Sequence, residues 1–211
     1  MRPIADCKLY GILDLGYVKR EKVVSTTQQL LDGGVNVLQL RAKGFDPAVI
    51  ESMALEMLPL TRDAGTPLII NDFPEIAAKV GADGIHVGQD DIKIARVREI
   101  VGHEMLVGKS SHSLDQARAA AGEAGVDYIG FGPIFATPTK PTYIPIGMDD
   151  IAQVHRDVSI PIFCIGGIKL ENVERILEAG ARRVVIVSGI LQALDIPAYI
   201  RDVRALIDSH S

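Results

Sequence analysis

Polar and charged side chains that could bind a ligand follow short apolar runs at several places in this 211-residue chain. The second such run ends in Gln39, Leu40, Arg41, Ala42 and Lys43. Side chains alternate along an extended strand, so Gln39, Arg41 and Lys43 are expected to point the same way. An amide and two cations that converge on one spot suit a phosphate or another anion. Taken alone, the Arg and the Lys are equally compatible with an ordinary protein surface.

Carboxylates follow the next two apolar runs. The third run ends at Asn71 and Asp72, and the fourth is followed by Asp90 and Asp91. Mg²⁺ typically takes one or two protein carboxylates and leaves positions for water and phosphate oxygens, so Asp72 and Asp91 are candidate metal ligands. Another interpretation stays open here, because Asp72 and Asp91 each precede a helical segment and could cap it. For Asp90 a capping or solvated role is preferred.

The later strand ends carry hydroxyl groups, a cation and glycines. Ser110 and His112 follow the fifth run, and a proline-braced loop after the sixth run supplies Thr137, Pro138, Thr139 and Lys140. The seventh and eighth runs end in Gly166-Gly167 and in Ser188-Gly189, where backbone amides could hold a phosphate, although the glycines could serve only tight turns. The strand ends therefore predict a cationic anion site with a metal and a neutral anion site, which would suit a diphosphate and a monophosphate.

A regular alternation of elements must position these residues. Short β-branched runs alternate with longer segments whose apolar residues recur at helical spacing. The predicted strands are 8–13, 35–40, 68–70, 84–87, 105–107, 128–131, 161–165 and 184–187. The predicted helical faces are Val23, Val24, Thr27, Leu30 and Leu31; Ile50, Met53, Ala54, Met57 and Leu58; Leu114, Ala117, Ala121 and Ala124; Val173, Ile176 and Leu177; and Ile200, Val203, Leu206 and Ile207.

Glycine and a capping motif mark where helices end and begin. Gly33, Gly81, Gly125 and Gly180 stand where a helix is expected to end in the left-handed conformation before the next strand. Ser113 and Gln116 match a capping box.

Eight apolar strands that alternate with helices indicate a parallel sheet covered by helices. Eight units in this length predict a compact (β/α)₈ TIM barrel, with residues 1–211 as one α/β domain. A doubly wound sheet would need a GxGxxG loop directly after the first strand, where the chain has Leu13-Asp14-Leu15-Gly16 instead.

Composition narrows the classes of function. The 22 basic and 27 acidic residues give a net charge of −5 without blocks of like charge, so no nucleic acid is expected as a partner. No apolar stretch resembles a membrane span or a signal peptide. Cys7 and Cys164 lie in apolar runs without metal-ligand spacing and are expected to be buried free thiols. We expect a cytoplasmic protein without membrane partners; whether it is a homo-oligomer stays open.

Seven short motifs occur in order along the chain. They are Gln39-Leu-Arg41-Ala-Lys43, Asn71-Asp72, Ala82 to Asp91, Gly108-Lys-Ser110-Ser-His112, Gly132 to Lys140, Ile165 to Ile168 and Val187-Ser188. This ordered set resembles the thiamine phosphate synthase family, whose members are transferases that join the pyrimidine and thiazole halves of the vitamin. The resemblance implies two small-molecule substrates and displacement of pyrophosphate from the pyrimidine methylene by the thiazole nitrogen, through a carbocation-like state.

The resemblance also implies roles for individual residues. Mg²⁺ would be held by Asp72 and Asp91. The hydroxymethylpyrimidine diphosphate would be bound by Gln39, Leu40, Arg41, Ala42, Lys43, Asn71, Ser110 and Lys140, of which Arg41, Lys43, Ser110 and Lys140 would be catalytic. The thiazole phosphate would be bound by Thr137, Pro138, Thr139, Gly167, Val187 and Ser188.

Two positions depart from the family pattern and bear on the electrostatics expected of the pocket. Ala42 stands where an acidic residue is common, and Lys109 replaces a commoner small apolar residue.

Two other functions are compatible with some of these residues. A thiazole tautomerase of the same barrel family would use a His such as His112, but such relatives lack the pair Asp72 and Asp91. A non-catalytic binder of thiamine precursors would have no use for a metal pair. The synthase is therefore the preferred interpretation.

Overall fold

The structure, a computed structural model, describes residues 3–137, 139 and 142–210. Within them, eight parallel strands form a closed barrel in sequence order, each paired with the next and β8 paired with β1. The strands are β1 Leu9–Asp14, β2 Val37–Arg41, β3 Leu68–Asn71, β4 Gly84–Val87, β5 Leu106–Ser111, β6 Tyr128–Phe131, β7 Ile162–Ile165 and β8 Val184–Ile186. The predicted (β/α)₈ barrel is confirmed.

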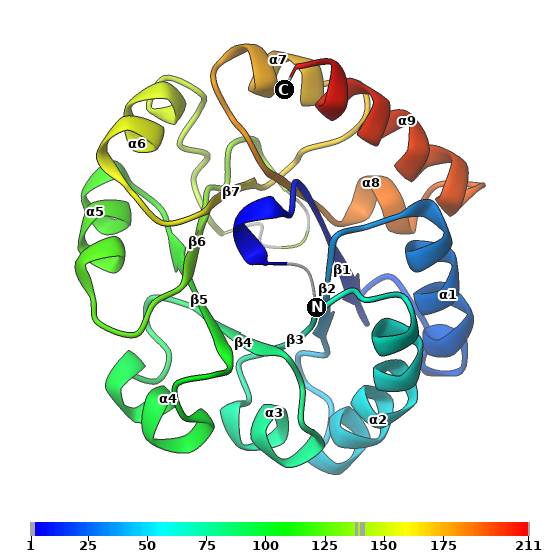
Figure 1. Ribbon diagram of the computed structural model, residues 1–211. Coiled ribbons are helices and arrows are strands. Elements are labelled where there is room, and N and C mark those ends of the chain that lie inside the picture. The colour runs from blue at the N-terminus through cyan, green and yellow to red at the C-terminus, as the bar shows by residue number, and fades with distance from the viewer. Residues whose placement is uncertain (1–2, 138, 140–141, 211) are drawn as a thin grey trace.

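Helices surround the barrel on all sides (Figure 1). They are α1 Val23–Gly33, α2 Pro47–Asp63, α3 Pro74–Val80, α4 Ile94–Val101, α5 Leu114–Gly122, α6 Ile151–Asp157, α7 Val173–Glu178, α8 Ser188–Leu191 and α9 Ile196–Ser209. Short 3₁₀ helices span Ile4–Asp6 and Arg20–Lys22. The first of them lies across the amino-terminal end of the barrel, which faces the viewer in Figure 1.

Two hydrophobic cores hold these layers together. The larger core lies between strands and helices, and the smaller one fills the inside of the barrel with Tyr10, Tyr128, Phe163 and their apolar neighbours. Cys7 and Cys164 are buried free thiols, as predicted. Burial raises the pKa of the Cys164 thiol to about 12, so this thiol stays protonated at neutral pH.

The most consequential difference from the predicted strands is at β5. The sequence predicted a strand over 105–107, but β5 continues to Ser111, so Lys109 and Ser110 lie within the strand. Their side chains therefore point to opposite faces of the barrel wall. Polar residues obscured this continuation, since the strand is apolar only in its first half.

Helix prediction was less complete. No face was predicted for α3, α4, α6 or α8, which have 7, 8, 7 and 4 residues and show few periods of apolar spacing, although the face of the 6-residue α7 was predicted. Two predicted face positions are wrong. Val24 is exposed, and Ala124 is exposed beyond the end of α5.

The helix-end signals are partly confirmed. Gly81 caps α3 in the left-handed conformation, but at the end of α1 this role belongs to Gly34. Gly33 is instead the last residue of α1, where a Cβ would lie 2.7 Å from Ile200 Cβ, so it permits close packing of α1 on α9. The Ser113 hydroxyl accepts from the backbone N–H of Gln116, as a capping box requires. The Gln116 side chain, however, accepts from the backbone N–H of His112 and not from that of the capping residue Ser113.

A repeated device closes the amino-terminal end of the barrel. The residues directly before β2, β4 and β6 are Asn36, Asp83 and Asp127. Their side chains accept backbone N–H groups at the start of the strand before: Lys8 and Leu9 for Asn36, Leu68 for Asp83, and Val107 for Asp127. Backbone N–H groups at the strand starts, which the sheet leaves unpaired, thereby gain hydrogen-bond acceptors.

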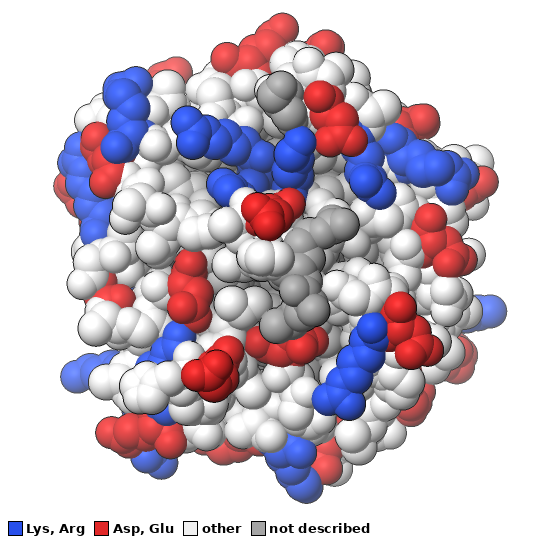
Figure 2. Space-filling model, viewed as in Figure 1, with Lys and Arg blue, Asp and Glu red and all other residues white. Residues whose placement is uncertain are grey.

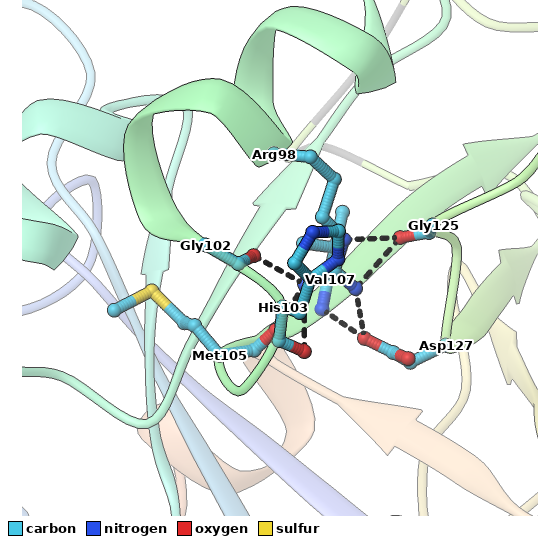
Figure 3. Close-up of polar contacts among 7 residues, drawn as sticks. All are labelled: Arg98, Gly102, His103, Met105, Val107, Gly125 and Asp127. Carbon is cyan, nitrogen blue, oxygen red and sulfur yellow. Dashed lines mark hydrogen bonds and ion pairs between the residues drawn. The ribbon is translucent and has the colours of Figure 1, made fainter.

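The third copy of this device is anchored further by Arg98 of α4. Its guanidinium donates to the carbonyls of Gly102, Met105 and Gly125 and to the Asp127 carboxylate (Figure 3).

Basic and acidic side chains alternate around this end of the molecule (Figure 2), without a uniformly basic face toward the viewer. Among the described residues, no helix is long and apolar enough to span a membrane.

Candidate active site

Two adjoining pockets open at the carboxyl ends of the strands. The first, with an open volume of about 790 Å³, is lined by residues of all eight strands and includes Thr137, Gly167, Val187 and Ser188 in its wall. The second lies over β2 to β5 and includes Lys43, Asp72 and Asp91. Arg41, Asn71, His86, Ser110 and Thr139 line both pockets. The strand ends that the sequence singled out thus meet at one site.

The trio at the carboxyl end of β2, Gln39, Arg41 and Lys43, is positioned by acidic and amide partners. Arg41 Nη1 lies 2.5 Å from Asp14 Oδ2 at the end of β1, and this carboxylate is almost fully buried. Gln39 donates from Nε2 to Asn71 Oδ1 at 3.1 Å. Lys43 Nζ lies 3.0 Å from Asp72 Oδ2. The cations therefore reach the site already oriented by neighbouring strand ends, as the alternation predicted.

Asp72 and Asp91 lie in the same pocket and influence each other. Burial raises the pKa of Asp72, Lys43 opposes this effect, and the nearby Asp91 adds to it. Asp72 also has a φ of 68°, the one positive φ at a described non-glycine residue. Such a conformation costs free energy in a residue with a Cβ and is often retained at functional sites.

The alternative role as helix caps is excluded. The capping residues of α3 and α4 are Phe73 and Lys93, neither of which makes a side-chain cap, and the Asp91 carboxylate accepts from Gly88 N–H instead. Asp90 is exposed at the pocket rim, in agreement with a solvated role.

The carboxylate pair suits a hard divalent cation, because the negative charge of Asp91 raises the pKa of Asp72 and a bound cation would offset this repulsion. No group of three or more His, Cys, Asp or Glu suited to a metal occurs in the described part of the chain, so any ion here would rely on substrate or water oxygens for its other ligands.

Ser110 stands between the two pockets. Its hydroxyl lies 3.1 Å from His86 Nε2, and its carbonyl accepts a short hydrogen bond from Gln89 Nε2. His112, two residues further on, has its Nδ1 2.5 Å from the Gly132 carbonyl and its ring against that of Tyr143. A hydrogen bond to a carbonyl requires a proton on Nδ1 of His112.

The neutral end of the site is formed by the β6–α6 loop and by the ends of β7 and β8. The Thr139 hydroxyl lies 3.0 Å from the Tyr17 hydroxyl, and Thr139 N–H donates to Thr137 Oγ1. Gly167 has a φ of 63°, and a Cβ there would lie 2.6 Å from the Ala136 carbonyl oxygen. The turn and the close loop contact by themselves require this glycine.

Several predicted residues do not present side chains to the pockets. Leu40 and Ala42 are buried in the core between strands and helices, so they could contact a ligand only through the backbone. Lys109 points away and pairs with Glu123 at 2.6 Å. The departures at Ala42 and Lys109 therefore leave the pocket lining unchanged. Pro138 and Lys140 lie outside the described residues.

The predicted site lacked His86 and Gln89, which line the pockets. It also lacked Asp14 and Tyr17, which contact the lining residues Arg41 and Thr139. Asp14 ends the first strand and could have been found by applying the strand-end rule there. His86 lies within β4, where the apolar neighbours Ile85 and Val87 masked the inward alternation.

A closed parallel barrel with one polar site at the carboxyl ends of its strands defines a (β/α)₈-barrel enzyme scaffold. Residues 9–190 match the family described as thiamine monophosphate synthase. The chain is 42% identical to a thiamine-phosphate synthase of Chloroflexus aurantiacus, over 97% of this chain and 94% of that protein. It is 40% identical to one of Pelotomaculum thermopropionicum, with the same coverages.

The fold agrees with these relatives. A solved thiamine phosphate pyrophosphorylase from Pyrococcus furiosus superimposes with a TM-score of 0.87 at 26% identity, covering 98% of each chain. The chain therefore belongs to the thiamine monophosphate synthase family.

Proposed function

We propose that this protein is a thiamine-phosphate synthase. It would condense hydroxymethylpyrimidine diphosphate with the thiazole ethyl phosphate to give thiamine phosphate and pyrophosphate. The observation that carries the proposal is the joining of a charged pocket and a more neutral one through shared residues, among them Arg41, Asn71 and Ser110. A reaction between a diphosphate and a monophosphate needs two such sites with the reacting carbon at their junction. The free, buried cysteines support a cytoplasmic setting.

The pyrimidine diphosphate would lie across the charged pocket. Arg41 and Lys43 supply cations, and Lys140 of the β6–α6 loop would add a third. The amide pair Gln39 and Asn71, joined at 3.1 Å, offers donors and acceptors that suit an aminopyrimidine ring. Ser110 at the junction would contact the diphosphate close to the bond that breaks.

Asp72 and Asp91 would hold Mg²⁺ against the diphosphate. The ion would neutralise charge on the leaving group when bound. The chain's own cations act in the same direction, because Arg41, Lys43 and Lys140 stabilise negative charge that grows as pyrophosphate departs.

The thiazole phosphate would occupy the other pocket. Thr137, Thr139 and Ser188 offer hydroxyls, and the backbone at Gly167 and Val187 offers amides to a phosphate. Pro138 would also contact this ligand. The C–O bond to pyrophosphate would break to leave a carbocation-like methylene on the pyrimidine. The thiazole nitrogen, facing this carbon, would form the new C–N bond. No general base is required, since the nitrogen attacks with its own lone pair.

The tautomerase alternative would use His112 for proton transfer. In this chain its Nδ1 is engaged with the Gly132 carbonyl, and the carboxylate pair of the charged pocket would have no use in an isomerisation. The synthase accounts for both pockets.

The test is direct. Purified protein is mixed with both substrates and Mg²⁺, and thiamine phosphate is followed by mass spectrometry while pyrophosphate release is measured. Turnover that requires both substrates and is lost in excess chelator is the expected result. If both substrates bind normally and no pyrophosphate is released, the proposal is wrong; isomerisation of the thiazole phosphate alone would point to the tautomerase.

A further inference from the structure

A chain of hydrogen-bonding groups runs from the inside of the barrel up to the site. The Tyr10 hydroxyl lies 3.1 Å from the Tyr128 hydroxyl, which lies 3.3 Å from His86 Nδ1. His86 Nε2 in turn lies 3.1 Å from Ser110 Oγ. Ser110 thus stands at the upper end of a line of polar groups that is otherwise enclosed by the barrel.

The strands are built to bring these groups together. His86, Gly108 and Tyr128 are register partners on the adjacent strands β4, β5 and β6. A Cβ at Gly108 would lie 2.2 Å from the Tyr128 ring and 2.5 Å from His86 Nδ1, so only glycine leaves room for their contact. Below them, Phe163 packs edge-on against both tyrosine rings and fixes their positions.

Burial determines the direction of the hydrogen bonds. Tyr10 and Tyr128 are almost fully buried, and burial raises the pKa of both phenols, so each keeps its proton and must donate it. Within the described residues, Tyr10 has a single partner, the Tyr128 hydroxyl. Tyr10 therefore donates to Tyr128, because the opposite direction would leave a buried O–H without an acceptor.

The remaining directions follow in turn. With its oxygen accepting from Tyr10, Tyr128 donates to Nδ1 of His86, which must be unprotonated there. A neutral imidazole carries its proton on one nitrogen, so Nε2–H is the donor toward Ser110 Oγ. Ser110 then has no acceptor below it and directs its own O–H upward, into the two pockets that it joins.

We propose that His86 is a positioning residue which, held by Tyr128 and Tyr10, keeps the Ser110 hydroxyl aimed as a donor at the departing diphosphate. This role rests on the proposed synthase function, because the donor would stabilise the negative charge that grows on the departing diphosphate. A hydroxyl whose direction is set beforehand need not reorient during the reaction, which favours the transition state over the ground state.

The first experiment reads the tautomer without any turnover. Protein labelled with ¹⁵N-histidine is studied by long-range ¹H–¹⁵N NMR in the absence of substrates, and the His86 signals are assigned by their loss in His86→Gln. The expected result is a neutral ring protonated at Nε2 and unprotonated at Nδ1. A ring protonated at Nδ1 would overturn the proposal, whatever the enzyme's activity.

The second experiment is a double-mutant cycle on the single-turnover rate at saturating substrates, with His86→Met, Ser110→Ala and the double variant. His86→Met should lower the rate about tenfold, as for one hydrogen bond. It should have little further effect in the Ser110→Ala protein, because His86 acts through Ser110. His86→Gln, whose amide can still donate to Ser110, should recover most of the rate. Equal effects of His86→Met with and without Ser110 would contradict the proposal.

Two further variants separate this role from packing. Tyr128→Phe removes the donor to His86 but retains the ring, so it should lower the rate with an unchanged KM, and it serves if His86→Met fails to fold. Thr27→Val removes another buried hydroxyl, in α1, which has no hydrogen-bond partner among the described residues; it should leave the rate unchanged. A rate in Tyr128→Phe equal to wild type would count against the relay. Absence of turnover in the wild-type protein would instead refute the synthase function and leave the tautomer result standing.

Discussion

Arg41 is held in place by a buried carboxylate at the end of the neighbouring strand. The Asp14 side chain is 3% exposed and that of Arg41 14%, and their closest atoms are 2.5 Å apart. A pair this enclosed has lost most of its hydration, so its geometry is maintained by the two charges together. Asp14 also accepts from Gly16 N–H, which ties the pair to the β1–α1 loop.

Replacing this carboxylate tests the orientation of Arg41. We expect Asp14→Asn to raise the KM for the pyrimidine diphosphate about tenfold, since the guanidinium stays but loses the partner that aims it. Steady-state kinetics with each substrate varied in turn measures the effect. Glu99→Gln, which breaks the exposed pair with Arg96, is the matched control and should leave KM unchanged. An unaltered KM in Asp14→Asn would show that Arg41 needs no such support.

The carboxylate pair predicts a metal requirement. Asp72→Asn and Asp91→Asn should each raise the Mg²⁺ concentration needed for half-maximal turnover at least about tenfold, because one of two charged ligands is lost. Asp90→Asn, at an exposed carboxylate of the same pocket, is the control and should resemble wild type. A Mg²⁺ dependence identical to wild type in both variants would exclude the proposed ligands.

Asp72 also predicts a pH dependence of stability. The pKa of Asp72 is raised chiefly by burial, so the folded protein binds this proton more tightly than the unfolded chain does. The free energy of unfolding therefore falls as pH rises from the unfolded value of about 3.9 through the higher folded pKa. In metal-free buffer, Asp72→Asn should be more stable than wild type by about 0.5 kcal/mol near neutral pH, and the difference should vanish near pH 3.

Urea unfolding of both proteins across this pH range measures the difference. Asn also tolerates the positive φ at this position, so the backbone adds no cost of its own. A variant less stable than wild type at neutral pH would mean that the ion pair with Lys43 outweighs the cost of burial.

At the scale of elements, the two ends of the barrel have separate roles. The carboxyl ends of the strands carry the pockets, while Asn36, Asp83, Asp127 and Arg98 secure the amino-terminal end. In barrels of this kind, residues at the amino-terminal end are expected to contribute stability rather than catalysis.

Arg98 gives this division a test. Its side chain is 10% exposed and donates to four carbonyls and one carboxylate of the α4–β5 and α5–β6 loops (Figure 3). Arg98→Ala should lower the free energy of unfolding by about 3 kcal/mol, since the acceptors lose their donor, and leave KM for both substrates unchanged. Arg96→Ala, in the exposed pair on the same helix, should cost less than about 0.5 kcal/mol. A large change in KM would place Arg98 in communication with the site.

The contact between two loops changes how Gly167 can be tested. The turn after β7 packs against the β6–α6 loop, and a Cβ at Gly167 would lie 2.7 Å from Phe135 Cβ. A larger residue would disturb this contact and the left-handed turn whether or not phosphate binds there. Ser188, at the start of α8, is the better probe of the neutral pocket.

For the whole molecule, the two pockets should bind their ligands separately before reaction. Lys43→Ala should weaken binding of the pyrimidine diphosphate about tenfold and leave the thiazole phosphate within about twofold, because a lost cation acts mainly on the diphosphate. Ser188→Ala should show the opposite preference. Calorimetric titration with each ligand alone measures both constants. If either variant weakens the two ligands equally, the assignment of ligands to pockets is wrong.

The sequence by itself determined the barrel, the strand order and the residues that gather at its carboxyl end. Apolar strands that alternate with helices predict a parallel sheet that is buried on both faces. Polar residues placed at the end of each strand then lie together at the carboxyl end of the barrel. Gln39, Arg41, Asn71, Asp72 and Ser110 were found in this way, because their positions in the chain fix the end of the barrel to which they belong.

Only the tertiary structure decided which side chains touch. Asp14 and Arg41 are 27 residues apart in sequence, and Tyr10 and Tyr128 are 118 apart, so no local pattern reports their contacts. The missing side chain at Gly108 acts by leaving space between strands, which becomes visible only once the neighbouring strands are in register. Strand positions follow from local chemistry, but the partners of a buried polar group depend on how separate strands pack, and that is settled when the barrel closes.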